Sequence, residues 1–140
     1  MIRRCAECGA RNRVPARHLA DQGRCGACKA ALPPLAEPLD VNTAELDEIV
    51  GAAMVPVLVD FWASWCPPCR VVAPEVKKVA AEMAGKALVL KVDTEQNPEL
   101  ARRYGVTALP TFVVLRSGKQ VARQAGAVDS RTLRRRLAAA

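Results

Sequence analysis

Apolar positions between residues 39 and 140 follow two alternating periods, one typical of strands and the other of helices. The predicted strands are residues 39–41, 57–63, 87–92, 111–115 and 120–124. The predicted helices are residues 42–50, 66–84, 98–104 and 129–137. Strand 57–63 is almost continuously apolar, as expected for a strand covered on both faces. The order β-α-β-α-β-α-β-β-α predicts an α/β fold, in which a mixed sheet carries helices on both faces.

Residues 1–35 have a different pattern, with few large apolar side chains and two Cys-x-x-Cys pairs. A proline-rich segment follows, with three prolines between residues 32 and 38, and such a segment is extended and stiff. We therefore predict a small module at 1–35, a linker to about residue 38, and a main domain at 39–140. Because the apolar pattern gives the main domain a core of its own, we expect it to fold without residues 1–35.

The two pairs of the first module have the spacing of a four-thiolate zinc site, with Cys5, Cys8, Cys25 and Cys28 as ligands. Two structural disulfides are the alternative that the residues leave open. Four thiolates complete a tetrahedral shell, so His18 is interpreted as a surface residue and the zinc as structural. A module this short cannot fold by burial alone, and metal binding would supply much of its folding free energy.

A third Cys-x-x-Cys pair, Cys66 and Cys69, follows the strand 57–63 at the predicted start of a helix. Unpaired N–H groups and the helix dipole stabilise a thiolate there, so the pair is typical of dithiol/disulfide exchange. The alternative is half of a metal site. The two prolines between the cysteines and the intact strand-to-helix pattern favour the redox interpretation.

The formal charge of +7 is concentrated at the N-terminus, where residues 1–35 hold seven Lys or Arg against two acids, a net of +5. This basicity keeps open an adaptor function, in which a zinc ribbon binds nucleic acid or protein. The module has no aromatic residue for base stacking, so nucleic acid is not the expected partner. No secretion signal and no membrane span of about 18 apolar residues is recognisable, and we expect a cytoplasmic protein without a membrane partner.

Several motifs of the main domain resemble thioredoxin. They are the stretch Val59–Arg70 with its Trp-Cys-Pro-Pro-Cys core, the pair Leu109-Pro110 before Thr111, the strand Lys91-Val92-Asp93, and Gly126. Together with the four-cysteine module, nearly the whole chain resembles the zinc-binding second thioredoxin of bacteria. The resemblance implies a thioredoxin fold preceded by a zinc-ribbon-like module.

The resemblance also implies catalytic roles. Cys66, expected to be exposed, would attack a substrate disulfide, and the more buried Cys69 would resolve the mixed disulfide. Asp60 would assist deprotonation of Cys69 through water, with Lys91 tuning its pKa. Pro110 would be a cis-proline facing the disulfide. From the residues alone, Asp60 is either a buried functional carboxylate or a solvent-facing strand residue, and Pro110 is either cis or an ordinary trans proline.

A substrate-docking surface is implied beside the dithiol. Its residues would be Trp65, Pro67, Pro68, Leu109 and Gly126. Trp62 is expected to pack beneath the site instead. Pro67 departs from the family pattern, which has glycine there, and removes a backbone N–H near the Cys66 sulfur. The departure concerns the redox potential and not the fold.

The expected activity is reduction of protein disulfides, with thioredoxin reductase, an NADPH-dependent flavoprotein, recharging the dithiol. The expected cofactors are one structural zinc and the redox-active disulfide, without an organic cofactor. A thiol oxidase or isomerase of the same fold is an alternative that ordinarily needs an oxidising compartment.

Overall fold

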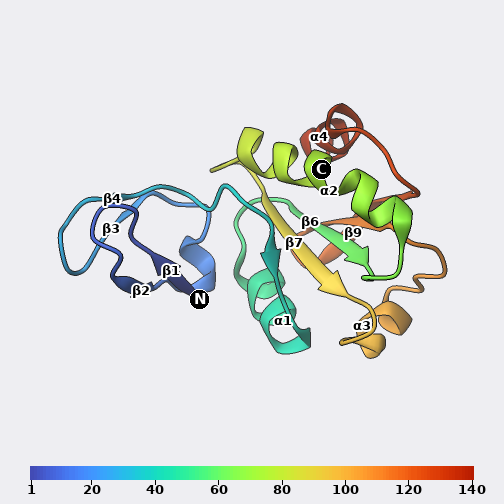
Figure 1. Ribbon diagram of the computed structural model, residues 1–140, viewed down its shortest axis with the longest axis horizontal. Coiled ribbons are helices and arrows are strands. Elements are labelled where there is room, and N and C mark those ends of the chain that lie inside the picture. Colours follow the sequence, from blue (N-terminus) through green and yellow to red (C-terminus); the bar gives the residue numbers. More distant parts are fainter.

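The computed structural model describes residues 1–140 and shows a small N-terminal module beside a larger domain (Figure 1). Two antiparallel hairpins and one short 3-10 helix make up the module, which has no larger sheet. Its elements are β1 (Ile2–Arg4), β2 (Arg11–Arg13), η1 (Ala16–His18), β3 (Gly23–Arg24) and β4 (Ala31–Leu32). Each hairpin carries one Cys-x-x-Cys pair in or beside the turn that joins its two short strands.

The main domain contains all the predicted helices and strands in the predicted order, with ends that differ by one or two residues. They are β5 (Leu39–Asp40), α1 (Thr43–Ala52), β6 (Val57–Trp62), α2 (Pro67–Glu82), β7 (Leu88–Asp93), α3 (Pro98–Arg103), β8 (Thr111–Arg116), β9 (Lys119–Ala125) and α4 (Ser130–Ala138). Local sequence signals set several of these boundaries. Asn42 and Glu45 form a reciprocal capping box at α1, and the Asp129 carboxylate accepts the Thr132 N–H at 2.9 Å to start α4.

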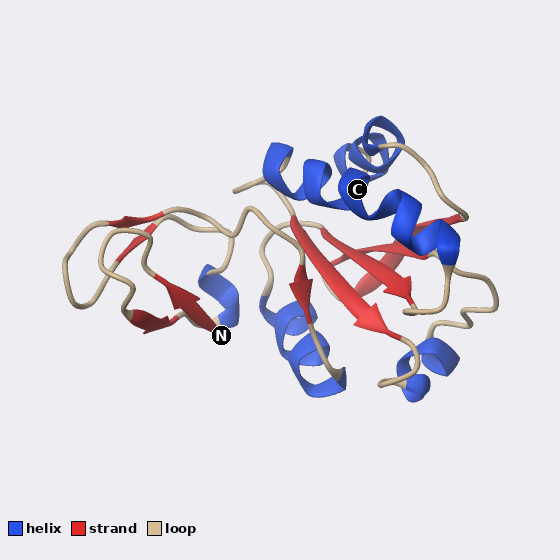
Figure 2. Ribbon diagram, viewed as in Figure 1, coloured by secondary structure: helices blue, strands red, loops and turns tan.

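Five strands form one mixed sheet in the order β5-β7-β6-β8-β9 (Figure 2). Strands β5, β7 and β6 are parallel, and β8 and β9 continue antiparallel. Ser117 and Gly118 both have positive φ, 52° and 78°, which fits the tight turn between β8 and β9. Side chains of α1 and α3 cover one face of the sheet, and those of α2 and α4 cover the other. The predicted mixed sheet with helices on both faces is therefore confirmed.

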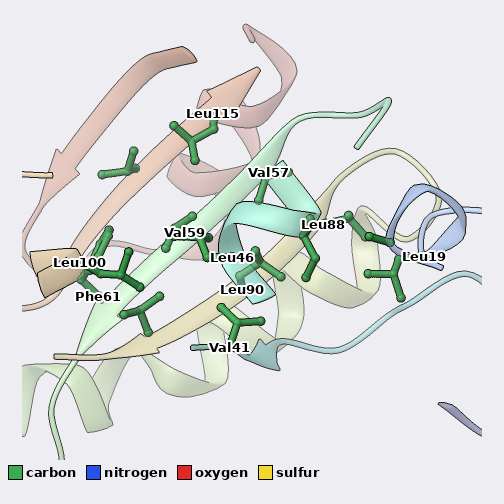
Figure 3. Close-up of a cluster of buried hydrophobic side chains, with 14 of the residues drawn as sticks. Leu19, Val41, Leu46, Val57, Val59, Phe61, Leu88, Leu90, Leu100 and Leu115 are labelled. Atoms are coloured by element: carbon green, nitrogen blue, oxygen red, sulfur yellow. The ribbon is translucent and has the colours of Figure 1, made fainter. Parts of the chain in front are cut away.

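The core on the α1 face extends into the N-terminal module (Figure 3). Leu19, which directly follows η1, is 1% exposed and belongs to the same cluster as Leu46 and Ile49 of α1 and Leu88 of β7. Ala16 is buried in that cluster too. Leucine burial of this kind stabilises a protein by about 2 kcal/mol. The two modules therefore share the core cluster on the α1 face, whereas the cluster under α2 and α4 consists of main-domain residues alone.

This shared cluster corrects one expectation from the sequence. The proline-rich segment does not merely space the modules, because Leu35 within it is also buried in the cluster. The main domain keeps the second cluster as its own, and its folding without residues 1–35 stays a prediction. No periodic signal in the sequence indicates this contact, since Ala16 and Leu19 lie in a module with few large apolar side chains. Only the path of the chain brings them to α1.

Candidate functional site

The candidate dithiol lies where β6 ends and α2 begins. Cys66 is the N-cap of α2, and Pro67 and Pro68 occupy the first two helical positions. Proline is tolerated there because those N–H groups have no partner within a helix. The remaining nearby donor is the Cys69 N–H, whose nitrogen lies 3.2 Å from the Cys66 sulfur. The two cysteines form a disulfide, with their Cα atoms 5.3 Å apart.

The expected difference in exposure between the two cysteines is not observed. Cys66 is 2% exposed and Cys69 is 6% exposed in the disulfide form. The bonded sulfur atoms pack in a small cluster with Ala63, Trp62 and Leu109. Because the bond itself covers part of each sulfur, an expectation based on two separate thiols does not apply to the oxidised state.

Asp60 lies in the middle of β6 and is 2% exposed, so it is not a solvent-facing strand residue. Burial raises its pKa to about 7, while the nearby Lys91 charge opposes this increase and the Asp40 charge adds to it. Its Oδ1 atom is buried without a hydrogen-bond partner. A carboxyl group in this environment exchanges a proton near neutral pH.

Lys91 is the cross-strand neighbour of Asp60 on β7. Its Nζ lies 4.6 Å from the centre of the Trp62 ring, in a cation–π contact. A cavity of about 240 Å³ has Lys91, Trp62 and Cys69 in its wall. Trp62 is half-buried and packs against the disulfide, in agreement with its expected place beneath the site.

Several apolar side chains lie beside the disulfide. Trp65 is 63% exposed, and Pro67 and Pro68 are exposed beside it. Leu109 is half-buried and packs against the cysteine cluster. Trp65, Pro67 and Pro68, three of the residues predicted to dock substrate, are thus exposed on either side of Cys66 in the sequence.

The segment before β8 packs against the disulfide through Leu109. The Leu109–Pro110 peptide bond is cis, and Pro110 is buried. The Pro110 carbonyl accepts a hydrogen bond from the Gly126 N–H at 2.8 Å, which fixes Gly126 next to this segment. The backbone N–H and C=O of Leu109 have no hydrogen-bond partner in the chain. They are therefore free to pair with an extended peptide.

The four cysteines of the N-terminal module converge, with all four sulfur atoms within 4.8 Å of one another. The Cys5 and Cys28 sulfurs are 3.6 Å apart, as are those of Cys8 and Cys25, and none of the four is in a disulfide. Tetrahedral zinc with Zn–S bonds of about 2.3 Å separates its sulfur ligands by about 3.8 Å. The cluster has the donor set and spacing for zinc. His18 is outside it and hydrogen-bonds to Asp21.

Asn12 is a residue of this centre that the sequence analysis missed. Its Oδ1 accepts the Gly26 N–H at 2.8 Å, and its Nδ2 lies 3.5 Å from the Cys25 sulfur. Hydrogen bonds from the Cys28 N–H and then from Asn12 lower the pKa of Cys25 to about 6, which favours the thiolate. Asn12 thereby joins the two hairpins at the four-cysteine cluster. Nothing in the spacing of the cysteines points to it.

Comparison with known proteins agrees with this arrangement. Residues 37–139 match the family model described as Thioredoxin. The chain belongs to the thioredoxin family. Residues 4–30 also match the model described as Thioredoxin 2, N-terminal, a zinc ribbon. The chain is a thioredoxin of this zinc-binding type, with the predicted fold of a zinc ribbon followed by a thioredoxin domain.

Individual relatives cover most of the chain. Thioredoxin C-3 of Corynebacterium nephridii is 41% identical over 128 residues, 91% of this chain and 87% of that protein. Thioredoxin of Synechocystis is 43% identical over 93 residues, 66% of this chain and 87% of that protein. Among solved structures, that of a point mutant of thioredoxin from Halobacterium salinarum superposes with a TM-score of 0.69 at 36% identity, covering 75% of this chain and 91% of that one.

The biochemical activity follows from this family membership and from the Cys66–Cys69 disulfide. This thioredoxin is a thiol–disulfide oxidoreductase that acts on protein disulfides. Its general partners are disulfide-containing substrates and a reductase. No helix combines the length and the apolar character needed to cross a bilayer.

Proposed function

We propose that this thioredoxin reduces protein disulfides through a mixed disulfide at Cys66. The Cys66 thiolate attacks one substrate sulfur, and the other substrate sulfur leaves as a thiolate. The Cys69 thiolate then attacks the Cys66 sulfur, releasing the first substrate sulfur and forming the Cys66–Cys69 disulfide. Two electrons pass from the dithiol to the substrate. The supporting observation is the position of Cys66 as helix N-cap, with the Cys69 N–H as a donor to its sulfur.

Asp60 is the proposed proton acceptor for Cys69. A pKa near 7 lets the carboxylate take a proton from a thiol during resolution and return it to solvent afterwards. The cavity that has both Cys69 and Lys91 in its wall has room for water beside Cys69. Asp60 is not in that wall and is linked to it through Lys91, its cross-strand neighbour. Lys91 limits the increase in the Asp60 pKa by its positive charge.

Substrate docking is assigned to the apolar surface beside the disulfide. Trp65, Pro67 and Pro68 supply contact area, and Leu109 supplies unpaired backbone groups for an extended substrate segment. Pro110 and Gly126 hold the Leu109 segment in place through the hydrogen bond between them. Recognition through backbone groups and apolar contact suits an enzyme with many substrate sequences.

The proposed role of Cys5, Cys8, Cys25 and Cys28 is to hold one structural zinc ion. When bound, zinc cross-links the two hairpins, and its four thiolates leave no position for substrate. The ligands act by holding β1–β4 together, so that Leu19 stays seated against α1. The metal takes no part in the disulfide exchange.

We assign recharging of the dithiol to an NADPH-dependent flavoprotein thioredoxin reductase, as for the family, and place the chain in the cytoplasm. Four unpaired thiols in the same chain as a redox-active pair suit a reducing compartment, where they stay available for zinc.

Reduction of insulin disulfides tests the function directly. With dithiothreitol or thioredoxin reductase and NADPH as electron donor, the protein accelerates precipitation of the insulin B chain, and Cys66→Ser abolishes the acceleration. Ser64→Ala serves as a matched control, since it removes an exposed hydroxyl two residues away and leaves both thiols in place. Full activity of Cys66→Ser would contradict the proposal.

A further inference from the structure

A row of three charged residues crosses the sheet beneath α2. Asp40 of β5 pairs in register with Lys91 of β7, and Lys91 pairs with Asp60 of β6. Residues in register on neighbouring strands have side chains on the same face, and neighbouring strands lie about 4.8 Å apart. A negative, a positive and a negative group therefore follow one another, from exposed Asp40 through half-buried Lys91 to buried Asp60.

Lys91 is free to interact with either carboxylate. It forms no ion pair within 4 Å with Asp40 or Asp60, and its Nζ rests over the Trp62 ring. Lys91 and Asp40 line the same two cavities, one of about 340 Å³ under the linker and one of about 420 Å³ towards α1. The two side chains thus border the same two cavities, and Lys91 also lines the cavity beside Cys69.

We propose that Asp40 is a positioning residue for the reaction, because its carboxylate competes with Asp60 for the charge of Lys91 and so keeps Asp60 a stronger base. This inference rests on the proposed role of Asp60 as proton acceptor. The cause is electrostatic: a second negative charge beside Lys91 offsets part of the stabilisation that Lys91 gives to the Asp60 carboxylate. The Asp40 charge accordingly contributes to the raised pKa of Asp60.

Other charged groups face these cavities. They are Glu37 of the linker, Lys77 and Arg70 of α2, Asp93 of β7 and Glu45 of α1. None of these groups is in register with Lys91, whereas Asp40 is. Asp40 is therefore expected to act on Lys91 more strongly than the other charged groups do. Glu37 provides a matched comparison, since it lines the same 340 Å³ cavity and carries the same charge.

The test compares Asp40→Asn with Glu37→Gln in the full-length, zinc-loaded protein. The Asp60 carboxyl carbon is followed by NMR from about pH 5 to about pH 9. For Asp40→Asn we expect the titration midpoint of Asp60 to fall by about half a pH unit. The rise of the disulfide-reduction rate on the low-pH side of its pH profile should move to lower pH by the same amount. For Glu37→Gln we expect less than half of that shift. Because Asp40 is exposed, salt at about 1 M should shrink the difference between Asp40→Asn and the natural protein.

An unchanged midpoint in Asp40→Asn, or an equal shift in both variants, overturns the inference. Asp60→Asn separates this failure from failure of the proposed function. If Asp60→Asn removes the pH-dependent limb while Asp40→Asn shifts nothing, Asp60 is the proton acceptor but Asp40 does not position it. If Asp60→Asn leaves the rate profile unchanged, the role of Asp60 itself is wrong, whatever Asp40 does to the midpoint.

Discussion

The Leu35 N–H donates a hydrogen bond of 2.9 Å to the carbonyl of Leu19, and both side chains are buried in the core beneath α1. Leu19 belongs to the zinc ribbon, and Leu35 lies in the proline-rich segment that leads to the thioredoxin domain. The contact joins the ribbon to the thioredoxin domain through backbone and side chain together. We therefore expect the ribbon to contribute to the free energy of unfolding of the whole chain.

Leu19→Ala should destabilise the thioredoxin domain as well as the ribbon. Removing a fully buried leucine leaves a cavity in the shared core and costs about 2–5 kcal/mol in the free energy of unfolding. Urea denaturation followed by tryptophan fluorescence reports on the domain, because both tryptophans are at the dithiol site. Met54→Ala is the matched control, since Met54 is 82% exposed and should change stability by less than about 0.5 kcal/mol. Equal effects of the two substitutions would contradict the shared core.

Removal of zinc should lower the melting temperature of the thioredoxin domain. Without the metal the hairpins lose their cross-link, and Leu19 is no longer held against α1. We expect a decrease of several degrees, about 2–4 °C for each kcal/mol lost. A strong chelator is added in the presence of a reductant, and melting is followed by tryptophan fluorescence. A melting temperature that does not move on chelation shows two energetically independent modules.

Asp60→Asn should increase stability above about pH 7. The folded-state pKa of Asp60, about 7, lies above its ordinary value of 3.8, so between these values the folded protein holds a proton that the unfolded chain has lost. The contribution of Asp60 to the stability of the natural protein therefore falls as pH rises from about 4 to about 7 and then levels off. Asp60→Asn has no carboxyl group to titrate at this position. Its free energy of unfolding should therefore exceed that of the natural protein by an amount that grows over the same pH range to a few kcal/mol.

Urea denaturation of both proteins at about pH 4, 6 and 8 measures this difference, and comparing the two cancels the titration of all other groups. A constant difference across these pH values would show that Asp60 titrates normally.

Pro67→Gly should make the dithiol slightly more oxidising. Glycine adds a backbone N–H at the first helical position, next to the sulfur that now has only the Cys69 N–H as a donor. A charge-assisted hydrogen bond of about 1 kcal/mol stabilises the thiolate and thus the reduced form, which raises the reduction potential by roughly 20 mV. Equilibration with glutathione measures the potential. A lower potential would mean that the looser helix start outweighs the added donor.

The main domain was predictable because each element carries its own local signal. The apolar run of β6, the capping box at Asn42 and the turn at Ser117-Gly118 each specify structure within a few residues. The Cys-x-x-Cys spacing likewise identified the residues that converge in the metal cluster.

The parts that were not predicted depend on contacts between segments distant in sequence. Leu19 carries no periodic signal, and its burial requires the ribbon to fold back onto α1. Asn12 is an ordinary polar residue until the second hairpin places Gly26 and Cys25 beside it. The burial of Cys66 follows from the disulfide and from Trp62 and Leu109 around it, and the spacing of the cysteines reports none of these contacts.

Trapping a substrate on the Cys69→Ser variant tests the central claim most directly. Without the resolving thiol, the mixed disulfide at Cys66 should accumulate, and mass spectrometry of tryptic peptides should find the substrate cysteine joined to Cys66. The Cys66→Ser variant, mixed with the same oxidised substrate, should trap little. Trapping through Cys69 in Cys66→Ser, with none at Cys66 in Cys69→Ser, would show that the two cysteines have the opposite roles.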